Sequence, residues 1–169
     1  RFALTTAGIA TAAIGSTAAA ELISFEIHQD RYIGEAGWTL SDASSNVIAS
    51  MYISSSYIYI GTSQSATYSV GFGAWGSSTA VSGYRTTFNM DLAAGNYFVN
   101  MTDTWGDGWA WSANTGLDAF AVAGNIDGGS AQFAFTTGAS AVGAFTVVPA
   151  PGALALLGLA GLTSRRKRK

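Results

Sequence analysis

Hydrophobic and polar residues alternate along most of residues 21–148, with the period of two that is typical of half-buried β-strands. From Phe88 to Leu92 every second side chain is apolar, and the run from Tyr97 to Met101 repeats this pattern. Runs of Gly, Ser, Asn and Asp separate the alternating stretches, which carry no helical stripe. The pattern predicts strands at 22–28, 38–41, 46–53, 56–61, 66–72, 88–92, 96–102, 118–124, 130–136 and 142–147.

Many short strands joined by small polar turns favour an all-β fold. We predict a single β-sandwich of jelly-roll-like topology over residues 21–148. A domain of this length buries about two-thirds of the surface of its unfolded chain, so it needs no covalent staple. The chain has no cysteine, which excludes disulfides, thiolate nucleophiles and cysteine-based metal sites.

The charges are distributed unevenly. All ten acidic residues lie in 21–148, where the only basic residues are Arg31 and Arg85, giving a net charge of −8. Residues 149–169 carry five basic residues and no acidic one. We expect no nucleic-acid binding by the acidic domain, because neutralising phosphates requires clustered Lys and Arg. The negative charge suits cations, Ca²⁺ included.

Residues 1–20 have the pattern of a secretory signal peptide. Arg1 matches the end of a basic region, residues 2–14 are mildly apolar, and Ala18 and Ala20 fit the rule for cleavage before Glu21. The alternative is an Ala-rich helix belonging to the fold, but this stretch has no polar face to turn to water. The pattern therefore predicts export.

The C-terminal residues combine a proline motif, an apolar run over 152–162 and a basic end. The motif comprises Val148, Pro149, Ala150, Pro151 and Gly152, and the basic end comprises Arg165, Arg166, Lys167, Arg168 and Lys169. The eleven apolar residues form a predicted short helix of about 16 Å, against about 30 Å of hydrocarbon in a bilayer. This is too short for a permanent anchor and predicts transient insertion, with the basic end in the cytoplasm.

This tail resembles PEP-CTERM sorting signals, with Pro149-Ala150-Pro151 where the family's usual core is Pro-Glu-Pro. The resemblance covers residues 148–169, and we assign 149–169 to the sorting tail. It implies an exosortase-type processing enzyme as partner, a Gram-negative-type bacterial source, and delivery to the cell surface. A sortase signal would need Leu-Pro-x-Thr-Gly, and a GPI signal ends in its hydrophobic segment rather than in basic residues.

The most distinctive internal motif is Asp103-Thr104-Trp105-Gly106-Asp107-Gly108-Trp109, directly after the predicted strand 96–102. Together with Trp38-Thr39-Leu40-Ser41-Asp42 and Gly95-Asn96-Tyr97, it resembles a β-sandwich module of many secreted bacterial proteins. The resemblance covers roughly residues 22–125. It implies an extracellular structural or binding unit without catalytic activity.

The carboxylates of this motif allow two interpretations. Asp103 and Asp107, with Asp42 or Asp118, would form a Ca²⁺ site, because carboxylates spaced around glycines can wrap a hard cation. The match to an EF-hand is poor, since the third and twelfth positions lack acidic ligands. In the other interpretation the Asp side chains cap backbone N–H groups and the glycines adopt positive φ.

The tryptophans of the motif also allow two interpretations. Trp105, Trp109 and Trp111 lie within seven residues, and if exposed they would stack on the sugar rings of an extracellular polysaccharide. Alternatively they fill the end of the sandwich core, where buried aromatic rings contribute strongly to stability. Exposed rings favour a carbohydrate-binding module, whereas buried rings favour a structural protein.

Catalytic motifs are absent from the sequence. The sole histidine, His28, ends a predicted strand, and no serine lies in a Gly-x-Ser-x-Gly elbow. No P-loop or dinucleotide fingerprint occurs. A glycosidase would need two converging carboxylates, for which Glu26, Glu35, Asp103 and Asp107 are only weak candidates. We therefore predict a non-catalytic protein of the cell surface or extracellular matrix, without a cofactor unless Ca²⁺ binds.

Overall fold

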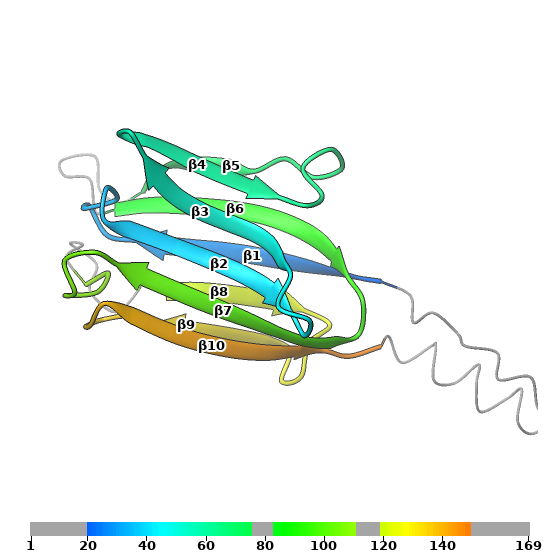
Figure 1. Ribbon diagram of the computed structural model, residues 1–169. Coiled ribbons are helices and arrows are strands. Elements are labelled where there is room, and N and C mark those ends of the chain that lie inside the picture. The colour runs from blue at the N-terminus through cyan, green and yellow to red at the C-terminus, as the bar shows by residue number, and fades with distance from the viewer. Residues whose placement is uncertain (1–19, 76–82, 111–118, 150–169) are drawn as a thin grey trace, which may run out of the picture.

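Figure 1 shows a computed structural model of the chain, which describes residues 20–75, 83–110 and 119–149. These residues form ten strands and no helix. The strands are β1 (Glu21–Gln29), β2 (Ala36–Asp42), β3 (Val47–Ser54), β4 (Tyr57–Thr62), β5 (Gly71–Trp75), β6 (Gly83–Leu92), β7 (Gly95–Asp103), β8 (Ala119–Gly124), β9 (Ser130–Ala134) and β10 (Ser140–Val147). Within the same residues no helix is long and apolar enough to cross a membrane. The predicted signal peptide and the predicted helix of the tail lie outside them.

The strands form two antiparallel five-stranded sheets, which confirms the all-β prediction and gives a two-layered sandwich (Figure 1). Sheet A has the order β5-β6-β1-β8-β9, and sheet B has the order β10-β7-β2-β3-β4. β1 pairs with β6 in one sheet while β2 pairs with β7 in the other. The connections β1–β2 and β6–β7 therefore both pass from sheet A to sheet B.

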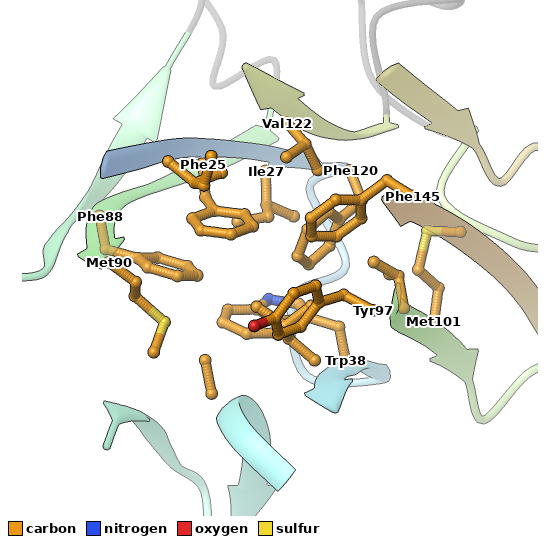
Figure 2. Packing of buried hydrophobic residues seen from close by; sticks show 14 of the residues in the cluster. Phe25, Ile27, Trp38, Phe88, Met90, Tyr97, Met101, Phe120, Val122 and Phe145 are labelled. Carbon is orange, nitrogen blue, oxygen red and sulfur yellow. The ribbon is translucent and has the colours of Figure 1, made fainter. Parts of the chain in front are cut away.

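The apolar positions of the alternating pattern meet between the sheets. Phe25 stacks on Phe88 within sheet A, with ring centroids 4.7 Å apart, and Trp38 of sheet B stacks on Phe88 at 5.7 Å. Phe120 meets the Trp38 ring edge-on at 5.5 Å. Figure 2 shows these rings converging from both sheets. Period-two burial along β1 and β7 confirms that the polar partners of these residues face outward.

The predicted strand at 66–72 is wrong over residues 66–70. Residues 63–68 form turns, and β5 begins only at Gly71. Side-chain bonds replace strand pairing here: the Gln64 amide donates to the Asp91 carbonyl (2.7 Å) and accepts from the Asp91 N–H (2.8 Å). The Tyr68 hydroxyl also donates to the Asp91 carboxylate at 2.8 Å. The alternating apolar residues of this stretch thus belong to a loop fastened to β6.

The two ends of the described domain lie at the same end of the sandwich (Figure 1). Glu21 pairs with Leu92 and Val147 pairs with Gly95, so both ends adjoin the β6–β7 corner. The hydroxyl of Tyr97 donates to the Ala93 carbonyl (2.9 Å) and holds that corner in place. The opposite end, which we call the distal end, carries the β1–β2 connection and the residues that follow β7.

Candidate functional site at the distal end

The segment Asp103–Trp109, hereafter the distal turn, is tied to three other parts of the chain. The Asp103 N–H donates to the Ala139 carbonyl and the Thr104 N–H to the Glu35 carbonyl, each at 3.0 Å. The Trp109 N–H donates to the Phe135 carbonyl at 2.7 Å. These bonds satisfy backbone N–H groups that lie at or beyond the end of β7, and they fix the backbone conformation of the turn.

Asp103 caps the turn from within. Its side chain is buried, and its Oδ1 accepts a 2.6 Å hydrogen bond from the Gly106 N–H. This geometry matches the interpretation in which an Asp side chain satisfies backbone donors. The Asp103 Oδ1 atom is therefore already used as a hydrogen-bond acceptor for the backbone.

Gly108 is required by both its conformation and its surroundings. Its φ is +79°, in the left-handed region that side chains rarely adopt. A Cβ at this position would lie 2.5 Å from the Thr137 backbone nitrogen and 2.8 Å from the Thr136 carbonyl carbon. Glycine thus allows the distal turn to pack closely against the segment between β9 and β10.

The two tryptophans of the distal turn have opposite environments. Trp109 is fully buried, its ring meets Phe135 edge-on at 5.4 Å, and its Nε1 donates to the Thr102 carbonyl at 3.1 Å. Trp105 is 84% exposed. The core interpretation therefore holds for Trp109, and a surface interpretation holds for Trp105. Trp111 lies outside the described residues.

A cavity of about 330 Å³ lies beside Trp105 and is lined by Tyr32, Glu35, Trp105 and Asp107. Tyr32 is half exposed, and the Arg31 guanidinium carbon lies 5.5 Å from the centre of its ring. The pairing of Ala36 with Asp103 brings the β1–β2 connection to the distal turn. The sequence did not identify Tyr32 as a site residue, because the pairing of Ala36 with Asp103 that brings it near Trp105 leaves no local sequence pattern.

The distal end carries concentrated negative charge. Burial raises the pKa of Glu35 above its usual value of 4.5, and the charges of Asp103, Asp107 and Asp30 raise it further. The Glu35 Oε2 atom is buried without a hydrogen-bond partner. Glu35 is therefore the acid of this group that the surroundings push toward its protonated form.

The other carboxylates named from the sequence lie elsewhere. Asp42 is at the opposite end of β2, where it accepts hydrogen bonds from the Ser44 N–H (2.8 Å) and from the N–H and side chain of Asn46, both at 2.9 Å. These bonds, led by the Asn46 side chain, lower the Asp42 pKa. Asp42 therefore does not join Asp103, and Asp118 lies outside the described residues.

Glu26 projects from the middle of β1 and accepts a 2.7 Å hydrogen bond from His28, on the outer surface of sheet A. It therefore does not converge with the carboxylates of the distal end. In the part of the chain that the structure describes, no three His, Cys, Asp or Glu side chains are grouped to hold a metal ion. Calcium binding by Asp103 and Asp107 stays a prediction.

The first residues of the predicted sorting motif are hydrogen-bonded to the domain. The Asn125 side chain donates to the Val148 carbonyl (2.9 Å), and the Val148 N–H donates to the Asn125 carbonyl (3.0 Å). Pro149 follows as the last described residue, and Ala150, Pro151, Gly152 and the basic run lie outside. The predicted motif thus begins at the last described residues of the domain.

No family model, curated protein or solved structure matches this chain. The PEP-CTERM resemblance of residues 148–169 and the module resemblance of the domain stay predictions. Function is therefore inferred from the arrangement of the residues themselves.

Proposed function

We propose that this is an exported, non-catalytic protein of the cell surface or extracellular matrix, sorted by its C-terminal tail. One observation carries the proposal: both ends of the described domain leave one end of the sandwich (Figure 1), and the exposed Trp105 follows β7 at the other end. A domain held to a membrane by residues 149–169 would present the distal turn outward. The nine residues of β7 would set it about 30 Å from the attached end.

The finer description of the fold belongs to the same proposal. We infer a jelly-roll-like topology, supported by the pairing of β1 with β6 and of β2 with β7 around two connections between the sheets. This topology is common in exported binding and structural modules.

The sorting proposal is tested in a bacterial host that has an exosortase-type enzyme. The full-length chain carries an epitope in the exposed Gly128–Gly129 turn, and protease treatment of intact cells reports surface exposure. We expect the epitope to be cleaved from intact cells and the chain to lose mass at its C-terminus. Replacing Pro149 and Pro151 by serine should abolish the mass change, whereas Thr163→Ser should not. An epitope that stays protected inside wild-type cells would contradict the proposal.

A second candidate function is carbohydrate binding at the distal end. The 84% exposure of Trp105 beside the half-exposed Tyr32 favours it, because exposed aromatic rings offer flat apolar faces to a ligand. The site would use Trp105 with Tyr32, and Trp109 would take no part because it is buried. Losing retention on an insoluble polysaccharide in Trp105→Ala, but not in Tyr57→Ala on β4, would support this function.

A further inference from the structure

The outer surface of sheet A is hollowed by a cavity of about 700 Å³, which we call the trough. It runs across β6, β1, β8 and β9, and Ser69 and Gly71 border it at the β5 side. Its floor consists of residues that alternate with core residues, because neighbours in a strand point to opposite faces. Phe25 and Phe88, for example, face the core between the sheets.

The strand register arranges the floor in two rows across the sheet. The pairings align the first row as Gly71, Thr87, Glu26, Ala121 and Gln132. They align the second row as Asn89, Ser24, Ala123 and Ser130. Neither row contains an aromatic residue or an aliphatic one larger than alanine. No large apolar side chain of these two rows therefore fills the trough.

The wall on the β5 side is held in place. The Gln64 amide makes two hydrogen bonds to the Asp91 backbone, and the Tyr68 hydroxyl binds the Asp91 carboxylate. A Cβ at Gly71 would lie 2.6 Å from the Thr87 hydroxyl oxygen, so glycine keeps this margin close to the floor. Because this wall is already ordered, less conformational entropy is lost when a ligand binds.

The chemistry of the floor suits a neutral, hydroxyl-rich ligand. It offers hydroxyl groups from Ser24, Thr87 and Ser130 and amide groups from Asn89 and Gln132, each of which both donates and accepts hydrogen bonds. The only charge in the two rows is Glu26. A polyanion would meet this carboxylate on a domain with a net charge of −8, so repulsion disfavours it.

A peptide is a poorer fit than a sugar chain. Extended peptides bind sheets mainly by adding a strand at an edge, where backbone groups are unpaired. The trough lies on the face of the sheet, and β6, β1 and β8 are each paired on both sides. Over these three strands only side chains are offered, and the trough reaches an edge strand only at Gly71 of β5 and at β9. One row beyond Glu26, the His28 ring stacks on Trp75 at 4.1 Å, which adds aromatic surface next to the trough.

We infer that the trough binds an extended segment of a neutral polysaccharide. The inference rests on the proposed surface location, where such polymers are met, and it adds a site on the face of sheet A that is separate from Trp105. A cavity whose lining extends over four strands suits an extended chain better than a small compact ligand.

The test is affinity electrophoresis of the full-length chain through native gels. The gels contain hydroxyethyl cellulose, galactomannan, xylan or dextran as neutral polymers, alginate as a polyanion, and gelatin as an extended polypeptide. We expect retardation by at least one neutral polymer and none by alginate or gelatin. Ala123→Trp fills the second row and should weaken binding by at least about tenfold. Gln132→Ala removes hydrogen-bonding groups and should weaken it about threefold to tenfold.

The matched control is Ala144→Trp, at another exposed alanine, which faces outward from β10 on sheet B. It should bind as the wild type does. A thermal unfolding midpoint within a few degrees of the wild type shows that each variant is folded. Absence of retardation by all four neutral polymers would overturn the inference, as would retardation by gelatin alone or equal loss in Ala123→Trp and Ala144→Trp. The surface location is measured separately, in cells, so either proposal can fail while the other stands.

Discussion

The distal turn contains two regions with opposite roles. Asp103, Gly108 and Trp109 are directed into the fold and bind it, whereas Trp105 and Asp107 border an open cavity. The two tryptophans are only four positions apart in the same motif, yet one is fully buried and the other is 84% exposed. One short motif thus combines residues that fix the turn to the fold with residues that are exposed to solvent. The presence of Asp103, Gly108 and Trp109 is explained by their structural roles alone.

The largest expected effect comes from removing the anchor. Trp109→Ala deletes a fully buried ring that contacts Phe135, and we expect it to lower the free energy of unfolding by about 3–5 kcal/mol. Trp105→Ala is the matched change, and we expect less than about 0.5 kcal/mol because that ring is exposed. Urea unfolding followed by circular dichroism measures both. Equal losses in the two variants would remove the distinction between the regions.

The next effect tests the close packing at Gly108. Gly108→Ala adds a Cβ in a left-handed conformation and within 3 Å of the Thr136–Thr137 backbone, so we expect a loss of about 2–4 kcal/mol. Gly129→Ala has nearly the same φ, +78°, with nothing within 4 Å of its Cβ. It should lose only the conformational part, about 1 kcal/mol. A loss at Gly129 as large as at Gly108 would show that contact with the 136–137 backbone is unimportant.

A smaller effect concerns the two carboxylates of the turn. Asp103→Ala leaves the Gly106 N–H without its acceptor, and we expect a loss of about 1–2 kcal/mol in the free energy of unfolding. Asp107→Ala removes a carboxylate that lines the cavity and should change stability by less than about 0.5 kcal/mol. Repeating both unfolding curves with Ca²⁺ and with EDTA tests the calcium prediction. If Ca²⁺ raises the urea midpoint of the wild type and Asp107→Ala abolishes the rise, Asp107 is a ligand of a bound calcium ion.

The smallest effect is a pH dependence. Because the folded chain raises the pKa of Glu35, it holds that proton more tightly than the unfolded chain does. The free energy of unfolding should therefore fall as pH rises from the usual value of 4.5 through the raised pKa. Glu35→Gln should lack this decline when urea midpoints are compared across the window.

Asp42 should contribute a pH dependence of the opposite sign, and the variant Asp42→Asn should lack it. The hydrogen bonds from Asn46 and Ser44 lower the Asp42 pKa, so its contribution is present above the usual value of 3.8 and lost as pH falls through the lowered value. A Glu35→Gln profile parallel to the wild type would show that the acidic surroundings of Glu35 have no energetic effect.

The sequence predicted the strands well where burial follows a strict period of two. β1 and β7 alternate between core and solvent, so their apolar residues identified them directly. For β6 the prediction covered only 88–92, because the first half of the strand points the polar Thr86 into the interior. The prediction failed at residues 66–70, where Tyr68 is held by a hydrogen bond to Asp91 rather than by strand pairing. Alternation reports which residues are apolar, but it cannot report which partner a side chain finds.

The sites were predicted less completely for the same reason. The motif itself identified the distal turn, but the choice between Trp105 and Trp109 depends on the bond from the Trp109 N–H to the Phe135 carbonyl, far along the chain. The trough depends on register: Ala121 lies beside Glu26 and Gln132 only because three strands align. A polar or small outward residue gives no sequence signal until its cross-strand neighbours are known.

The two hydrogen bonds between Asn125 and Val148 have a mechanical consequence. β10 is an edge strand of sheet B, and an edge strand pulled from its last residue would peel away one ladder bond at a time, beginning at the pair Val147 and Gly95. The two hydrogen bonds between Asn125 and Val148, with the bridge from Ile126 to Val147, lie directly at this point. Because Asn125 follows β8 of sheet A, we expect tension applied to the chain at Val148 to be divided between both sheets before the edge strand can open.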